Sequence, residues 1–160
     1  MSNSLTNYQN PLPTTKKEQL VKLLLFTLGN LNLALSIDSV KKILNYLPVH
    51  SSGLGFTGIT HLDEREITVI DLHKKLFRQS FKVAPNTKGY LILAKNSLGE
   101  SFGIWVKQAP TLIDIYLSQM RVLPESYRRS DTLEMASHVL ILPSESESTT
   151  VFVVDADHLL

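Results

Sequence analysis

The sequence contains no cysteine among its 160 residues, which excludes disulfide bonds, thiol nucleophiles and zinc thiolate sites. It also lacks an excess of either charge, because 16 Lys and Arg residues are matched by 15 Asp and Glu residues and the formal net charge is +1. Binding to nucleic acid and electrostatic attachment to a membrane both depend on a concentrated basic surface. We therefore expect no nucleic-acid partner.

Long apolar runs are absent as well. No stretch approaches the ~18 apolar residues that span a bilayer, and the polar start from Met1 to Pro13 does not have the pattern of a signal peptide. We therefore expect a cytoplasmic protein without direct membrane insertion. Residues 1–19 begin with a stretch rich in Ser, Asn, Thr and Pro, and this composition predicts a disordered leader.

Common catalytic motifs are missing too. The sequence has no Gly-x-Ser-x-Gly elbow, no phosphate loop and no His-Glu-x-x-His pair. His61, Asp71 and His73 could form a metal-binding or hydrolytic cluster. A metal site needs three or four ligands that converge on one point, and the spacing of these residues does not indicate such convergence. We interpret Asp71 and Asp155 instead as caps at the ends of strands. The sequence predicts no enzyme activity and no cofactor, and the metal-binding or hydrolytic protein remains an alternative.

The chain instead holds many short apolar or alternating segments separated by turn residues. Lys22 to Leu28 is an apolar run, Gly29 supplies a turn, and the segment from Leu31 to Ile37 alternates between apolar and polar residues. Such a pair is typical of a β-hairpin. Similar patterns predict further strands over the ranges 58–62, 67–72, 89–95, 102–106, 139–142 and 151–154.

The apolar spacing changes after the first hairpin. From Val40 to Leu47, apolar residues recur at i, i+3, i+4 and i+7, which predicts a short helix from Ser39 to Leu47. A second helical turn is predicted from Leu72 to Phe77, with Asp71 as its N-cap.

The same parts recur in the same order in two halves of the chain, approximately 22–79 and 88–160, within one domain over 20–160. Each half begins with an apolar strand and an alternating strand, passes a Leu-Pro pair and ends in a hairpin closed by Val-Ile-Asp or Val-Val-Asp. Many short strands are typical of small barrels. We predict two barrels of about five strands each, packed across a shared apolar seam.

Six short motifs keep a fixed order between Lys22 and Leu160. They are Phe26-x-Leu28-Gly29, Ala34-Leu35-x-Ile37-Asp38-x-Val40-x-x-Ile43-Leu44, Gly58-Ile59-x-x-Leu62, Ile67-x-Val69-Ile70-Asp71-Leu72, Gly103-Ile104-x-Val106 and Val153-Val154-Asp155. Together they resemble the CheW-like family of chemotaxis coupling proteins. The resemblance implies a mostly β fold of two small SH3-like five-stranded β-barrel subdomains around a shared hydrophobic core, with short helices.

The resemblance also implies a function. Family members are non-enzymatic scaffold or adaptor proteins of signal transduction. The expected partners are the tip of a methyl-accepting chemoreceptor and a CheA-type histidine kinase, with recruitment to membrane receptor arrays. The residues at the family's receptor-binding positions are Val40, Ile43, Gly58, Leu62 and Asp63. Each of them could instead be a core or turn residue, because apolar residues are common in both settings.

Asp63, Glu64, Arg65 and Glu66 form a predicted charged turn. It is either a solvated turn or a site that selects a partner by charge, since charges at an interface rim tune specificity. The family pattern has Arg-Gly where this chain has Asp63-Glu64, and an Asp where it has Lys107. These departures leave open a divergent CheW-like module with another partner, in pilus motility or phototaxis or as a competitor of the true adaptor.

Overall fold

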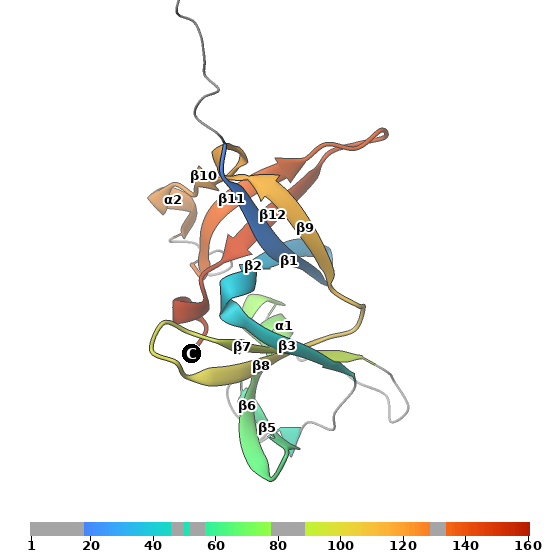
Figure 1. Ribbon diagram of the computed structural model, residues 1–160, viewed down its shortest axis with the longest axis vertical. Helices are drawn as coiled ribbons and strands as arrows, with labels where there is room; N and C mark the ends of the chain where they lie inside the picture. Colours follow the sequence, from blue (N-terminus) through green and yellow to red (C-terminus); the bar gives the residue numbers. More distant parts are fainter. Residues whose placement is uncertain (1–17, 46–49, 52–56, 78–88, 129–133) are drawn as a thin grey trace, which may run out of the picture.

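The computed structural model describes residues 18–45, 50–51, 57–77, 89–128 and 134–160, which form two β-sheets (Figure 1). Most of the predicted leader, residues 1–19, lies outside these ranges.

The first sheet combines strands from both ends of the chain, in the order β10-β11-β12-β2-β1-β9. The paired strands β1 and β2 form the hairpin that the alternating pattern predicted, with Leu28 opposite Leu31. Gly29 has a φ of 59° in the turn between them, a backbone conformation that favours glycine. The strands are β1 (Leu20–Leu28), β2 (Leu31–Ser36), β9 (Thr111–Tyr116), β10 (Arg121–Val122), β11 (Ala136–Leu142) and β12 (Thr149–Val154).

The second sheet is built from the middle of the chain, in the order β3-β7-β8-β6-β5-β4. Figure 1 shows it below the first sheet, with the β5–β6 hairpin projecting at the bottom. Its strands are β3 (Val40–Asn45), β4 (His50–Ser51), β5 (Thr57–Leu62), β6 (Arg65–Ile70), β7 (Tyr90–Lys95) and β8 (Ser101–Val106).

The two sheets repeat one topology. In the described part of the chain, each has five strands of six or more residues and one strand of two residues. One parallel pair occurs in each, β12 with β2 and β6 with β8. The two β subdomains of the predicted mostly β fold are thereby confirmed. The division into halves 22–79 and 88–160 stays a prediction, and each of these halves supplies strands to both sheets.

The predicted helix from Ser39 to Leu47 is wrong. A short 3-10 turn, η3 (Ile37–Ser39), leads directly into strand β3, which pairs with β7 from Val40 to Asn45. A bulge between Val40 and Lys42 shifts the register, and the extra residue breaks the period of two that marks a strand. The apolar residues are then spaced as in a helix, although β7 supplies the partner for their backbone groups.

The other helical segments are short. α1 (Leu72–Phe77) begins where predicted, and Asp71 Oδ1 accepts a hydrogen bond from the backbone N–H of Lys74 at 2.9 Å. The remaining ones are α2 (Glu125–Arg128), η4 (Leu117–Gln119) and η5 (Ala156–His158). None of the helices in the described ranges combines the length and apolar character needed to cross a membrane.

The main core lies between the two sheets. It takes Leu24 and Leu35 from the first sheet and Ile70, Ile92 and Phe102 from the second, all almost fully buried. Burying such side chains contributes about 1.5–3 kcal/mol each, so the seam is a major source of stability. The predicted shared core is confirmed. A smaller cluster belongs to the first sheet alone and consists of Leu23, Ala34, Ile115, Leu140, Val151 and Val153.

Candidate partner-binding surface

Val40 and Ile43 both lie on β3, which is an edge strand of the second sheet. Val40 is half-buried and packs against the main core, whereas Ile43 is 41% exposed. Lys41 and Lys42 between them are exposed, and Lys41 Nζ donates a hydrogen bond to Ser101 Oγ at 3.0 Å. Ile43 is therefore the apolar group that a partner can reach on β3, and Val40 holds the strand to the core.

The predicted charged turn is the tip of the β5–β6 hairpin. Leu62 and Arg65 form the last pair of the hairpin, and the two residues between them, Asp63 and Glu64, have φ values of 50° and 64°. A two-residue turn with positive φ at both positions is of type I′. All four charged side chains from Asp63 to Glu66 are exposed. The hairpin therefore presents three acidic groups and one basic group to solvent.

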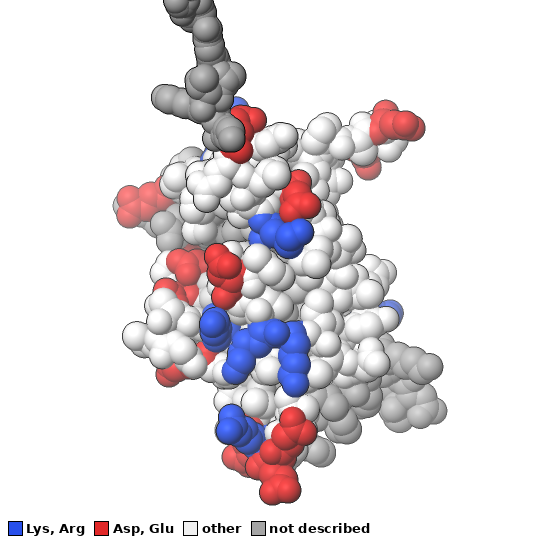
Figure 2. All heavy atoms as spheres, in the orientation of Figure 1, with Lys and Arg blue, Asp and Glu red and all other residues white. Residues whose placement is uncertain are grey.

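Gly58 and Leu62 lie on β5, where Gly58 is buried and Leu62 is half-buried. Three strands, β6, β8 and β7, separate β5 from β3 within the sheet, so backbone pairing does not bring the two groups of candidate residues together. Figure 2 shows one face of the molecule with Lys and Arg side chains gathered over β3 and acidic side chains at the hairpin tip below. This face offers a basic region and an acidic region.

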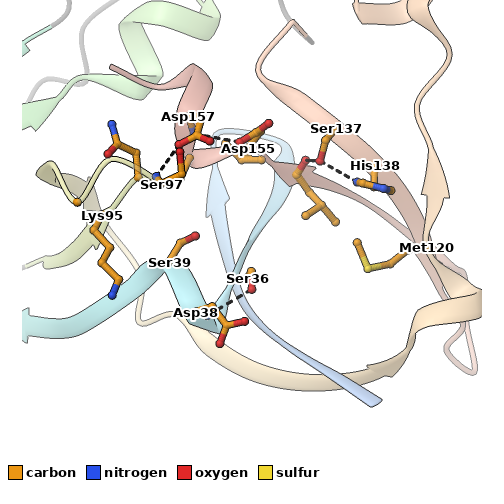
Figure 3. Close-up of a pocket in the computed structure, with 15 residues that line it drawn as sticks. Ser36, Asp38, Ser39, Lys95, Ser97, Met120, Ser137, His138, Asp155 and Asp157 are labelled. Atoms are coloured by element: carbon orange, nitrogen blue, oxygen red, sulfur yellow. Dashed lines mark hydrogen bonds between the residues drawn. The ribbon is translucent and has the colours of Figure 1, made fainter. Parts of the chain in front are cut away.

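A groove of about 530 Å³ lies where the two sheets meet (Figure 3). None of the five candidate receptor-binding residues lines it. It is lined by Ser36, Asp38, Ser39, Lys95, Asn96, Ser97, Gly99, Met120, Ser137, His138, Val153, Val154, Asp155, Ala156 and Asp157. Local sequence patterns do not predict this groove, because its walls come from five separate segments of the chain. Asp155, which the sequence indicates as a strand-end cap, is the one lining residue with a local signal.

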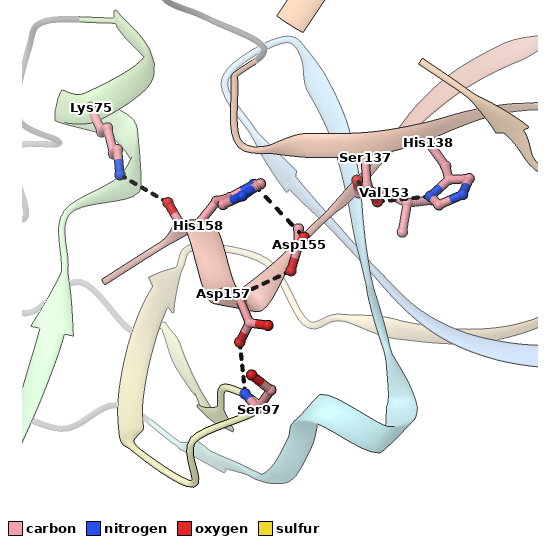
Figure 4. A network of polar contacts seen from close by, with 8 residues as sticks. All are labelled: Lys75, Ser97, Ser137, His138, Val153, Asp155, Asp157 and His158. Atoms are coloured by element: carbon pink, nitrogen blue, oxygen red, sulfur yellow. Dashed lines mark hydrogen bonds and ion pairs between the residues drawn. The ribbon is translucent and has the colours of Figure 1, made fainter. Parts of the chain in front are cut away.

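Polar contacts of η5, which we call the polar clasp, join this turn to the loop between β7 and β8 and to α1 (Figure 4). Asp157 Oδ1 accepts a hydrogen bond from the Ser97 backbone N–H at 2.7 Å, and this bond is the main cause that lowers the pKa of the Asp157 carboxyl. Lys75 Nζ donates to the His158 carbonyl at 3.3 Å. Asp155 Oδ1 caps the turn by accepting from Asp157 N–H at 3.0 Å, which confirms its interpretation as a cap.

The residues of the alternative metal-binding or hydrolytic cluster have other contacts. His73 packs against the Phe77 ring at 4.7 Å between centroids, Asp71 caps α1, and His61 Nε2 lies 3.7 Å from Glu66 Oε2 across the hairpin. Within the described ranges, no three His, Asp or Glu side chains gather in a way that could hold a metal ion.

Two sheets of one topology, joined by a shared core and a polar clasp, define a two-subdomain β protein with exposed strand and hairpin surfaces. The model of the CheW-like domain matches residues 22–160, and the chain belongs to this family. The fold is similar to the crystal structure of the scaffolding protein TtCheW from Thermoanaerobacter tengcongensis, with a TM-score of 0.69, 17% sequence identity and coverage of 88% of this chain and 87% of that one. No curated protein matches the sequence.

Proposed function

We propose that this chain is a non-enzymatic adaptor that couples the tip of a methyl-accepting chemoreceptor to a CheA-type histidine kinase. The observation that carries the proposal is the match of the CheW-like domain to residues 22–160. The likeness of the fold to a scaffolding protein supports it. An adaptor with these partners works in the cytoplasm, at membrane receptor arrays.

The receptor-binding surface in this proposal comprises Val40, Ile43, Gly58, Leu62 and Asp63. Ile43 is its apolar anchor because its side chain is 41% exposed, and a buried apolar centre with a charged rim is typical of protein interfaces. The lysines of β3 and the acidic hairpin tip form that rim. Rim charges set the choice of partner and the association rate more than the affinity.

The test is a binding titration of the full chain with a purified receptor tip fragment and, separately, with a CheA-type kinase from the same cell. We expect both to bind, and Ile43→Lys to weaken receptor binding by about tenfold or more, as the loss of an interface anchor does. Leu98→Lys is the matched control, because Leu98 is an 82% exposed apolar residue on the turn between β7 and β8. Absence of binding to both partners at tens of micromolar would contradict the proposal.

A divergent module with another partner is the second candidate, and the exposed carboxylate of Asp63 at the hairpin tip favours it. This partner would belong to a pilus-motility or phototaxis pathway, or the chain would compete with the true adaptor. Asp63→Arg restores the charge of the family pattern, and Asp63→Asn removes the negative charge alone. If the receptor tip binds Asp63→Arg but neither the native chain nor Asp63→Asn, the second candidate is supported over the first.

A further inference from the structure

The edges of the two sheets differ in how they are protected against pairing with another chain. In the described part of the chain, the edge strands are β3 and β4 in one sheet and β9 and β10 in the other. β4 and β10 have two residues each, and β3 carries a bulge and the exposed Lys41 and Lys42. Short strands, bulges and charged side chains, especially lysines, are among the means by which proteins prevent edge-to-edge association.

β9 has neither a bulge nor a lysine and is longer than two residues, and its one charged side chain is that of Asp114. At its end, Gln119 Oε1 already accepts a hydrogen bond from the Tyr116 backbone N–H at 2.8 Å. The six residues of β9 pair with β1 without a register shift, from Thr111 opposite Leu25 to Tyr116 opposite Leu20, and they include no Lys or Arg. Among the described residues, no strand pairs with its other edge, which Figure 1 shows at the rim of the upper sheet. β9 is therefore a regular edge strand of six residues, and no described strand pairs with the backbone groups of Leu112 and Asp114 on its outer side.

The side chains of β9 add a pattern to this open edge. Leu112, Asp114 and Tyr116 alternate along the strand and share one face. Leu112 and Tyr116 are exposed by 52% and 45%. Between them, Asp114 Oδ1 lies 3.1 Å from Lys22 Nζ on β1, and both charged side chains stay about half exposed. Along this face of β9, an acidic side chain, Asp114, therefore lies between two exposed apolar side chains, Leu112 and Tyr116.

We propose that β9 is a docking edge that takes up an extended segment of another protein as an additional strand. Backbone hydrogen bonds supply the affinity in this mode, and alternate side chains supply the specificity. The segment that fits has apolar, basic and apolar side chains opposite Leu112, Asp114 and Tyr116. This surface is separate from the β3 and hairpin surface of the proposed receptor contact.

A second copy of the chain fits β9 less well than such a segment. If two copies paired antiparallel through β9, with Leu112 of one opposite Tyr116 of the other, Asp114 of one copy would lie opposite Asp114 of the other. Like charges directly opposite each other in a sheet are destabilising. A basic side chain at that position instead places a second cation beside the Asp114 carboxylate, which stays 57% exposed in its ion pair with Lys22.

The test uses the full ¹⁵N-labelled chain and the peptide Ser-Val-Thr-Lys-Thr-Val-Ser, with a matched peptide in which Glu replaces Lys. We expect the Lys peptide to shift and protect the amides from Thr111 to Tyr116, and the Glu peptide to bind about fivefold to tenfold more weakly. A Lys peptide with alternate backbone amides methylated should not bind, because it lacks the hydrogen-bond donors of an added strand.

A charge-swapped chain, Lys22→Asp with Asp114→Lys, keeps the ion pair but reverses the charge on β9, so it should prefer the Glu peptide. Three results would overturn the proposal. The first is the absence of shifts in β9. The second is equal affinity for both peptides in the native and the swapped chain. The third is a dimer in sedimentation that Leu112→Lys dissociates, which would make a second copy the occupant. None of these results bears on receptor or kinase binding, which is measured separately.

Discussion

Asp63 and Glu64 are the non-glycine residues with positive φ in the described ranges. The left-handed region costs a residue with a Cβ about 1 kcal/mol, and Asp tolerates it better than most because its short side chain can bond locally. Glu64 has no such relief and stands where the family pattern has Gly. Glu64 therefore lowers the stability of the hairpin tip, and it places a carboxylate on the surface that we propose binds a partner.

We expect Glu64→Gly to raise the free energy of unfolding by about 1 kcal/mol, because glycine adopts a φ of 64° without strain. Urea denaturation of the two chains measures the difference. Glu64→Gln is the matched control, since it removes the charge and keeps the strained Cβ. A gain of the same size in Glu64→Gln would show that repulsion among the acidic side chains, and not backbone strain, limits stability here.

At the scale of elements, the ends of β6 and β12 are built alike. Asp71 follows β6 and caps α1, and Asp155 follows β12 and caps η5. These strands occupy equivalent places in the two sheets, each beside a parallel neighbour. A carboxylate at this point satisfies a backbone N–H that the turn would otherwise leave without a partner.

Replacement of the α1 cap tests this role. We expect Asp71→Ala to lower the free energy of unfolding by about 1 kcal/mol, as the loss of an N-cap does, in guanidinium denaturation. Asp71→Asn should lose less than Asp71→Ala, because its side-chain oxygen can still accept from Lys74 N–H. Equal losses in the two variants would mean that the negative charge, and not the hydrogen bond, is what matters.

The clasp between η5 and the second sheet should depend on pH. The Ser97 backbone N–H lowers the pKa of the Asp157 carboxyl in the folded chain. Asp157 therefore stabilises the fold above its unfolded pKa of about 4, and this stability is lost as the pH falls through the lower folded pKa.

We expect Asp157→Ala to lower the Tm at pH 7, and its gap from the native chain to shrink as the pH falls below about 4. Thermal unfolding between pH 2 and 7 measures this gap. Asp157→Asn keeps a hydrogen-bond acceptor without a charge, so its Tm should vary less with acid than that of the native chain. A gap that is constant over this range would show that the ionised carboxylate does not stabilise the clasp.

At the scale of the whole molecule, the chain crosses twice between its sheets. It begins in the first sheet with β1 and β2, builds the whole second sheet from β3 to β8, and then returns to complete the first from β9 onward. The main core also takes residues from both sheets. Neither sheet can therefore lose its structure without exposing apolar surface of the other.

We expect the two sheets to unfold in one transition. Leu140→Ala removes a buried side chain from the smaller cluster of the first sheet, at a cost of about 2–5 kcal/mol. The fluorescence of Trp105, on β8 of the second sheet, should then lose its native signal at the same lower denaturant concentration as the far-UV circular dichroism. Leu98→Ala, at an 82% exposed position, should change neither midpoint. A Trp105 midpoint that Leu140→Ala leaves unchanged would show that the sheets unfold separately.

Local patterns predicted the parts of this fold that local interactions determine. The hairpin of β1 and β2 follows from alternation on either side of Gly29, and the cap at Asp71 follows from its place between a strand and a helical turn. The segment from Val40 to Asn45 was predicted as a helix because its bulge imitates helical spacing. A bulge depends on the partner strand β7, more than 40 residues later in the chain, so no local pattern contains it.

The sequence by itself determined that the protein is mostly β and that a charged turn follows Leu62. Alternation, turn residues and charge act over a few neighbours, and that is why these features are visible in a string of residues. The tertiary structure alone decided which strands become edges, that β9 is left open, and that Lys95 and His138 line one groove. Those features depend on hydrogen bonds and packing between segments far apart in the chain, and only the folded molecule brings these segments together.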